Sequence, residues 1–463
     1  MKIKHFLLIG VASIIALSAC SKNENFDNRE NQAAIGYLQI SIDSQQSRTE
    51  GSKREPNFDT NDSKISSLHL LLINPANGII TQIIDAGIIN AGVSNPVQAP
   101  VGSHNLYVLV NASGNILNNI TVDVTKINEA IATISGSSDI NTNYANTTTG
   151  FLMVSANDNN KYYGSDDADS YINISANNTA TNPLNTNVKV DRVVAGIRAQ
   201  ANATEISITG VDDDQFTPII DEVVFNGFVL LNGQANTNLV QNWITSADAT
   251  TPAPTNAKLL MALSSADYYS KAGQIASYVN GVAVAQQPGI TFGTKAYTLE
   301  NRSEILEGNS ANDNVTTGVI FKITAKKAGS SIGTFYRVKN NGKCFTNKTD
   351  ALAEINSIID IELTDTTPVE DLRKNGLMVY ENGEMYYTFF IKDQNYKYKD
   401  ALYYAIHRNS IYDLTVNSIS KFGSDVPGGD IIDPENPNPI DGSYIQVSIT
   451  VNQWILNTIG VDL

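Results

Sequence analysis

Cys20 is the residue whose surroundings point most directly to a chemical reaction. It ends the run Leu17-Ser18-Ala19-Cys20, which follows a short, positively charged start and the apolar stretch 6–17. An apolar stretch of this length with a small residue before a cysteine is typical of a lipoprotein signal, in which the thiol is acylated and the cysteine becomes the new N-terminus. The sequence predicts a signal peptide over 1–19 and lipidation at Cys20. An ordinary secretory signal with an incidental cysteine is the alternative.

Arg48 is the second position with a chemical implication, because trypsin-like proteases cut after a basic residue in an accessible polar connection. It follows an isolated strand, 36–42, and lies in the polar stretch 43–64, which has the composition of a disordered, protease-sensitive segment. Cleavage between Arg48 and Thr49 would release the strand together with its lipid. Arg54 is a rival cleavage site, and an ordinary solvent-exposed arginine at position 48 is the simpler reading.

Other residue types that support catalysis or metal binding are few. After the signal only His69, His104 and His407 remain, and none has acidic or thiol neighbours at the spacing of a zinc site. The acidic clusters 166–169 and 212–214 lack the spacing of a calcium loop and are interpreted as solvated turns. We therefore expect no metal, no cofactor and no enzymatic activity.

Two tyrosine pairs and one further cysteine leave alternatives open. The pairs Tyr386-Tyr387 and Tyr403-Tyr404 could stack on sugars, although aromatic residues in strands more often serve packing. If Cys20 carries lipid, Cys344 has no partner for an intrachain disulfide and is interpreted as a buried apolar residue.

Composition restricts the class of partner. The chain has 463 residues, 42% of them hydrophobic and 17% charged, with a formal net charge of −16. This length is sufficient for two or three domains, and the negative charge argues against a nucleic-acid partner. No second long apolar run follows the signal, so no transmembrane helix is expected.

Two segments with strict alternation lie at opposite ends of the chain. Leu38, Ile40 and Ile42 alternate with polar residues and predict a half-buried strand. Near the C-terminus, the proline-rich linker 423–442 leads into a strand pair, 443–463. This strand pair either folds back onto its own domain or passes to a partner. Its alternating apolar residues and the following tryptophan are Ile445, Val447, Ile449, Val451 and Trp454.

Between these ends the pattern is that of short strands. We expect a domain over 49–187, containing one short helix around Ile127 to Ile134, and a second over 188–463 with a helix near Leu352 to Ile359 capped by Thr349. The Asn/Thr-rich stretch 175–187 marks the division.

Several motifs, taken in their order along the chain, resemble those of the FimA-type fimbrillins, also called type V pilins. They are the lipobox at Cys20, the strand before Ser47-Arg48-Thr49, the segment Gly102 to Asn111, Gly150-Phe151-Leu152-Met153, Val190-Asp191-Arg192-Val193, the run His407 to Leu414, the linker Pro434 to Pro437, and Ile449-Thr450-Val451 with Trp454.

This resemblance implies two transthyretin-like β-sandwich domains and a lipoprotein precursor, 20–48 being its propeptide. It further implies cleavage at Arg48 by an arginine-specific protease, loss of the strand Leu38–Ile42, and a donor strand at Ile445–Val451. The implied function is a structural subunit of a surface fimbria that supports adhesion and biofilm formation. Its expected partners are further copies of itself in a head-to-tail polymer, other fimbrial subunits, surface receptors, and the outer membrane through the lipid. A tip adhesin or a monomeric glycan-binding surface lipoprotein is the alternative.

Overall fold

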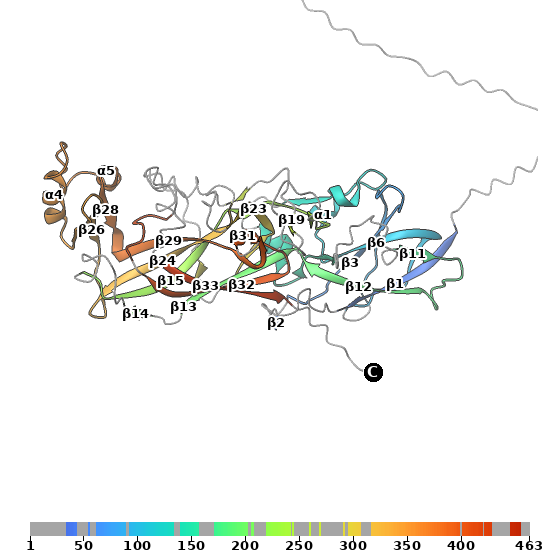
Figure 1. The fold of residues 1–463 in the computed structure, drawn as a ribbon. Helices are drawn as coiled ribbons and strands as arrows, with labels where there is room; N and C mark the ends of the chain where they lie inside the picture. Colours follow the sequence, from blue (N-terminus) through green and yellow to red (C-terminus); the bar gives the residue numbers. More distant parts are fainter. Residues whose placement is uncertain are drawn as a thin grey trace, which may run out of the picture.

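The fold is built mainly from β-strands along an elongated molecule (Figure 1). The computed structural model describes residues 34–43, 54–55, 62–88, 92–133, 139–156, 171–201, 205–207, 219–241, 243–244, 259–260, 268–269, 290–291, 295–306, 316–398, 401–419, 421–427 and 445–454. The mainly-β class predicted from the sequence is confirmed. None of the helices within these ranges is long and apolar enough to cross a membrane.

The first sheet lies at the right of Figure 1 and contains the N-terminal strand. Because β12 pairs with β1 over 184–189 and with β10 over 190–192, it connects two layers that enclose an aliphatic core. The strand order is β4 (Ile80–Asp85), β3 (Leu68–Ile73), β6 (Gly102–Val110), β10 (Met153–Ser155), β12 (Leu184–Arg192), β1 (Ile35–Asp43) and β5 (Val97–Pro100), with β11 (Tyr171–Ile174) beside β6.

The second sheet contains the C-terminal strand. Its order is β2 (Arg54–Glu55), β33 (Ile445–Trp454), β32 (Ser410–Ile419), β13 (Val194–Ala201), β22 (Lys295–Leu299), β16 (Gly233–Gln234) and β20 (Tyr268–Tyr269).

The third sheet packs against the second to form a sandwich. Inward-facing residues of both sheets belong to one hydrophobic core, for example Ile197 and Leu414 of the second sheet and Phe321 and Met385 of the third. The strands of the third sheet are β14 (Glu205–Ser207), β15 (Glu222–Leu231), β24 (Gly318–Lys327) and β25 (Ser330–Ser331), with β21 (Ile290–Thr291) beside β15 and β29 (Glu384–Phe390) beside β24.

A small module occupies the left end of the molecule in Figure 1 and is called here the tip module, residues 335–380. It has its own core, which includes Leu352, Leu372 and Leu377. The expected helix is present, but the side chain of Asn347, not that of Thr349, caps it by accepting from the backbone N of Thr349 at 2.8 Å. The elements are β26 (Phe335–Val338), β27 (Cys344–Phe345), α4 (Lys348–Asn356), α5 (Val369–Lys374) and β28 (Leu377–Tyr380).

Shorter elements complete the described chain. They are α1 (Gly114–Leu117), η1 (Ile127–Glu129), β7 (Ile131–Thr133), η2 (Ile140–Tyr144), β8 (Ala145–Asn146), β9 (Gly150–Phe151), β17 (Asn236–Asn238), β18 (Trp243–Ile244), β19 (Leu259–Leu260), β23 (Asn301–Leu306), η5 (Glu381–Gly383), β30 (Asp393–Tyr398) and β31 (Ala401–Ile406).

Two sequence-based expectations differ from the structure. The short helix expected over 127–134 is wrong: a 3₁₀ turn, η1, is followed by the strand β7, because β17 from the second half of the chain pairs with it. The division expected at 187/188 falls inside β12, so the first sheet continues to Arg192. The two-domain organisation itself stays a prediction.

Candidate functional site

The strand predicted at 38–42 is present as β1 and lies next to the edge strand β5 in the first sheet. Leu38 and Ile40 are fully buried and Ile42 is 6% exposed. β1 runs parallel to β12 and antiparallel to β5, so both of its edges are hydrogen-bonded within the sheet. We call the space that it fills between β12 and β5 the β1 groove.

The energetic consequence of losing β1 follows from this position. Its removal would expose the apolar floor on which Leu38, Ile40 and Ile42 rest, together with two unpaired strand edges. Unpaired edges beside apolar surface readily accept another strand. The β1 groove is therefore the place of one strand in the first sheet, and β1 fills it in the structure.

The predicted donor segment is present as β33 and pairs with its own domain. It lies antiparallel to β32, with Ile449 opposite Leu414. Val447 and Ile449 are half-buried and Val451 is 7% exposed against the core of the second and third sheets. Of the two arrangements considered from the sequence, the fold-back arrangement is the one in the structure. Its backbone extends from Ile445 to Trp454.

β2, which follows the expected cleavage region in the sequence, pairs with the end of β33. Its residues Arg54 and Glu55 pair in parallel with Gln453 and Trp454. The rival cleavage site, Arg54, is thus part of a strand. The lipidation and cleavage residues Cys20, Arg48 and Thr49, as well as the acidic clusters 166–169 and 212–214, lie outside the described residues.

Arg192 is the centre of a buried polar cluster that includes residues from both halves of the chain. Its Nε donates to the carbonyl of Asp62 at 3.0 Å, and its guanidinium lies 3.6 Å from the Asp62 carboxylate. Asn409 accepts from Nη1 of Arg192 at 3.2 Å and donates to Asp191 at 2.8 Å. The stretch 43–64, expected to lack structure, therefore includes at Asp62 a fully buried anchor.

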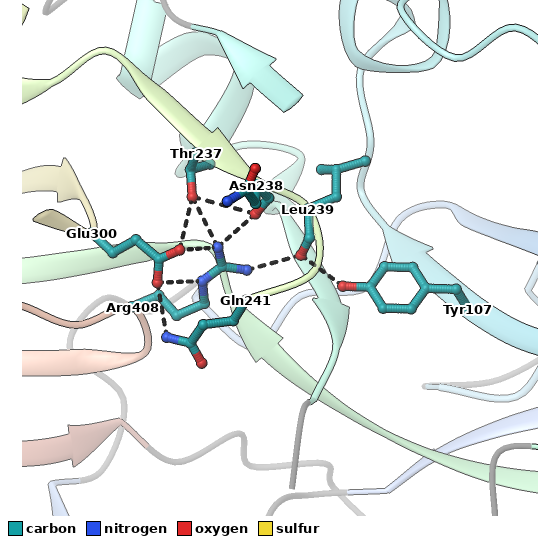
Figure 2. A network of polar contacts seen from close by, with 7 residues as sticks. All are labelled: Tyr107, Thr237, Asn238, Leu239, Gln241, Glu300 and Arg408. Carbon is teal, nitrogen blue, oxygen red and sulfur yellow. Dashed lines mark hydrogen bonds and ion pairs between the residues drawn. The ribbon is translucent and has the colours of Figure 1, made fainter. Parts of the chain in front are cut away.

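A second buried arginine, Arg408, lies next to Asn409 in the turn between β31 and β32 (Figure 2). Its guanidinium forms two hydrogen bonds with the Glu300 carboxylate, one of them Nε to Oε2 at 2.8 Å. Thr237 and Gln241 donate to the same carboxylate at 3.0 and 2.8 Å. The carboxylate charge is thus matched by one cation and two neutral donors.

The same arginine also reaches the first half of the molecule. Arg408 Nη1 donates to the carbonyl of Leu239 at 3.0 Å, and the Tyr107 hydroxyl donates to that carbonyl at 2.7 Å (Figure 2). Tyr107 belongs to β6 of the first sheet, and the Leu239 amide donates to the carbonyl of Ala130. The Arg408 cluster therefore joins the first sheet to the strands that carry the C-terminal segment.

The electrostatics of the two arginines differ. Burial lowers the pKa of Arg192 to about 10, although Asp62 and Asp191 oppose the shift. Burial also lowers the pKa of Arg408, but the charge and hydrogen bonds of Glu300, with Tyr107 and Asp191, raise it above its ordinary value. The paired carboxylate explains the difference: Arg408 has close hydrogen bonds with Glu300, whereas the Asp62 carboxylate is 3.6 Å from Arg192.

Asn111 supports the start of the first sheet. Its side chain accepts from the backbone N of Ser66 at 2.7 Å and donates to the carbonyls of Lys64 and Phe151 at 2.6 and 2.9 Å. Its φ of 57° lies in the left-handed region, which asparagine tolerates better than most residues. Asn111 thus fixes the chain that leads from the connection into β3.

The remaining sequence candidates serve packing. Tyr387, Tyr403 and Tyr404 are buried, and the half-buried Tyr386 donates its hydroxyl to the Glu384 carboxylate at 2.7 Å, so neither tyrosine pair forms a surface platform. His407 is buried, with Nδ1 3.1 Å from the Asp393 carboxylate. Cys344 is half-buried, not fully buried as expected, and its thiol donates to a backbone carbonyl. Within the described ranges, no three His, Cys, Asp or Glu side chains gather as a metal ion would require.

Sequence reasoning missed the partners of the two arginines. Glu300 and Thr237 lie far along the chain from Arg408, and Asp62 lies far from Arg192. A polar residue whose partner is more than a hundred positions away gives no local signal. In the sequence, only the family resemblance singles out Arg192, Arg408 and Asn409.

The C-terminal part of the chain matches a known protein family. Residues 378–459 match the family described as "Major fimbrial subunit protein type IV, Fimbrillin, C-terminal". This region contains β29 to β33 and the Arg408–Asn409 turn. A search among curated proteins finds no match.

Several solved structures of fimbrial proteins are similar to this chain at low sequence identity. A fimbrilin (FimA) from Porphyromonas gingivalis W83 is 15% identical, with 91% of this chain and 98% of that chain covered and a TM-score of 0.45. The tip fimbrial protein Mfa3 from Porphyromonas gingivalis is 13% identical, with 91% and 100% covered and a TM-score of 0.38. A fimbrial assembly protein from Parabacteroides distasonis is 8% identical, with 90% and 99% covered and a TM-score of 0.33. The family match therefore concerns the C-terminal strands, and residues 378–459 carry the fimbrillin C-terminal sequence pattern.

Proposed function

We propose that the chain is a structural subunit of a bacterial surface fimbria that polymerises by strand exchange. In this proposal the precursor is exported, lipidated at Cys20 and carried to the outer membrane. An arginine-specific protease cuts between Arg48 and Thr49, β1 leaves, and β33 of another copy fills the β1 groove. The resulting polymer serves adhesion and biofilm formation.

One observation carries the proposal: β33 has the pattern of β1 but is less completely buried. Both strands present three aliphatic side chains at alternate positions, Leu38, Ile40 and Ile42 in β1 and Val447, Ile449 and Val451 in β33. In β1 the first two are fully buried, whereas in β33 they are half-buried. Full burial of an aliphatic side chain stabilises by roughly 1.5–3 kcal/mol relative to exposure. Moving β33 into the β1 groove is therefore favourable once β1 has gone.

The structure also favours Arg48 over Arg54 as the cleavage site. Arg54 pairs with Gln453 of β33, and a protease must hold its substrate as a free extended segment. Cutting there would require β2 to detach first. A cut at Arg48 would leave β2 and the Asp62 anchor attached to the body of the protein.

Limited digestion of the purified precursor tests the proposal. An arginine-specific protease should produce a new N-terminus at Thr49, followed by detergent-resistant multimers on unheated gels. Arg48→Lys should block both events, whereas the matched variant Arg54→Lys should leave them unchanged. A stable monomer after complete cleavage at Arg48 would contradict polymerisation and support the alternative of a monomeric surface lipoprotein.

A pair of substitutions on opposite faces of β33 tests its role as donor. Ile449→Asp places a charge on the face that faces the core, whereas Thr450→Asp places the same charge on the exposed face. Multimers should be lost in the first variant and retained in the second. Equal assembly of both variants would show that another segment is exchanged.

A further inference from the structure

The chain that leads to β33 leaves the body of the protein at the tip module. The Asp425 carboxylate accepts from Arg373 Nε at 2.7 Å and from the backbone N of Val379 at 2.8 Å. The carbonyl of Gly423 accepts from the Tyr380 hydroxyl at 2.9 Å. Arg373 belongs to α5, and Val379 and Tyr380 belong to β28. The base of the segment 427–444 is therefore held by the tip module.

This attachment sets the direction in which the donor strand can move. β33 begins opposite the end of β32, near the left of Figure 1, and runs back toward the middle of the molecule. The sequence of segment 427–444 is rich in proline, and a polyproline II chain of this length would reach at most about 55 Å. A β33 that leaves its place on β32 therefore extends past the tip module, with its first residue nearest to it.

β1 has the direction that a donor strand from another copy would have if it entered the groove from the outer end of the first sheet. β1 begins at the right-hand end of the molecule and runs inward, parallel to β12 (Figure 1). A donor that enters the β1 groove from this outer end has the same direction as β1. Successive copies would then share one orientation, with the tip module of each facing the outer end of the next copy's first sheet.

Both of these ends expose apolar side chains. On the tip module Ile358 is 37% and Ile361 is 58% exposed, directly after α4. Val101, between β5 and β6 at the outer end of the first sheet, is 37% exposed, and Tyr171 of β11, opposite Asn105 of β6, is 36% exposed nearby. Ile35, 50% exposed at the start of β1, would leave with the propeptide. Of the eight large hydrophobic side chains that are exposed in the described ranges, five lie at or near these two ends.

We propose that the loop after α4, with Ile358 and Ile361, docks on the outer end of the first sheet of a second copy of this chain, at Val101 and Tyr171. The proposal rests on the proposed strand exchange and adds a second contact to it. The exchanged strand is joined to its own subunit only through a linker, so it alone would leave neighbouring subunits free to swing. Docking of the tip module fixes their relative position.

Photo-crosslinking tests this contact. A benzoylphenylalanine in place of Ile361 should, after cleavage and assembly, crosslink to peptides of another copy that contain Val101 or Tyr171. The matched control carries the same residue in place of Val124, which is 69% exposed in the loop beside β4. We expect at least tenfold fewer crosslinks between copies from this control position. The double variant I358D/I361D should slow multimer formation at least tenfold, and V124D should not.

The outcomes separate this contact from the strand exchange on which it rests. Multimers that form at the normal rate in I358D/I361D, with no crosslinks from position 361 to the first sheet, would overturn the docking contact and leave strand exchange standing. A wild-type chain that stays monomeric after cleavage would overturn both. If I358D/I361D does not fold, the crosslinks from position 361 decide the question alone.

Discussion

At the scale of single residues, the buried ion pair of Arg408 and Glu300 belongs to the cluster that connects the first sheet to the C-terminal strands. Arg408→Met would leave the Glu300 carboxylate buried, with only Thr237 and Gln241 as donors. Because removal of one partner leaves an uncompensated charge, we expect the free energy of unfolding to fall by about 3–5 kcal/mol in urea titrations.

An exposed ion pair provides the control for this substitution. Arg373 and Glu381 are 3.3 Å apart, and the Glu381 side chain is 60% exposed. Glu381→Gln should change the free energy of unfolding by less than about 1 kcal/mol. A similarly small loss for Arg408→Met would show that the buried cluster does not hold the two halves together.

His69 in β3 gives a prediction about pH. Burial lowers its pKa from the ordinary 6.5, and the charge of Asp85 only partly opposes the shift. Below pH 6.5 the unfolded chain therefore binds a proton at His69 that the folded chain does not bind, so stability falls as the pH falls. Between pH 7 and pH 5, thermal melting of His69→Gln should decline less than that of the wild type. Parallel curves for the two proteins would contradict this assignment.

At the scale of elements, β1 should stabilise the precursor but not the mature subunit. Ile40 is fully buried, so Ile40→Ala should lower the free energy of unfolding of the precursor by about 2–5 kcal/mol. After cleavage the substituted strand is gone, and the melting temperature of the multimer should equal that of the wild type. Ser41→Ala, on the other face of β1, is the matched control.

A multimer that is destabilised by Ile40→Ala would show that β1 stays in its groove. The prediction therefore separates a permanent scaffold strand from a displaceable one. Both states are measurable on the same purified protein before and after digestion.

Several elements could be predicted because their signal is local. The alternation of Leu38, Ile40 and Ile42 and of Val447, Ile449 and Val451 identified β1 and β33 directly. The helix α4 followed from its own periodicity, and its cap was misplaced by only two residues. Apolar residues that recur every two or 3.6 positions are sufficient to predict a strand or a helix where the segment's own side chains determine its structure.

Other elements depend on partners that are distant in the sequence. The segment Ile131–Thr133 is a strand because β17, a hundred positions later, pairs with it. β33 folds onto β32, where Val447, Ile449 and Val451 pack against the core of the second and third sheets. The sequence left this arrangement open, since the same apolar face fits either groove.

At the scale of the whole molecule, the two strands of the proposed exchange lie in different sheets, and each is flanked by two neighbouring strands. β1 lies between β12 and β5 in the first sheet, and β33 lies between β32 and β2 in the second. The chain between them passes through the buried clusters of Arg192 and Arg408. In the proposed exchange, these clusters would keep the body of the subunit intact while it loses one strand and accepts another.

The most direct test is to follow β33 with paired cysteines in a C344S background. Ser448 lies opposite Thr415 in β32, and outward-facing Ser41 of β1 lies opposite Asn187 in β12. In the precursor, S448C and T415C should form a disulfide within one chain. When the thiols are kept reduced during cleavage at Arg48 and are oxidised in air after assembly, this disulfide should be replaced by one between S448C of one copy and N187C of another, with the same exchange expected from T450C or N452C if the register differs by two or four residues. Persistence of the disulfide within one chain, with none of the three positions bonding to another copy, would contradict strand exchange.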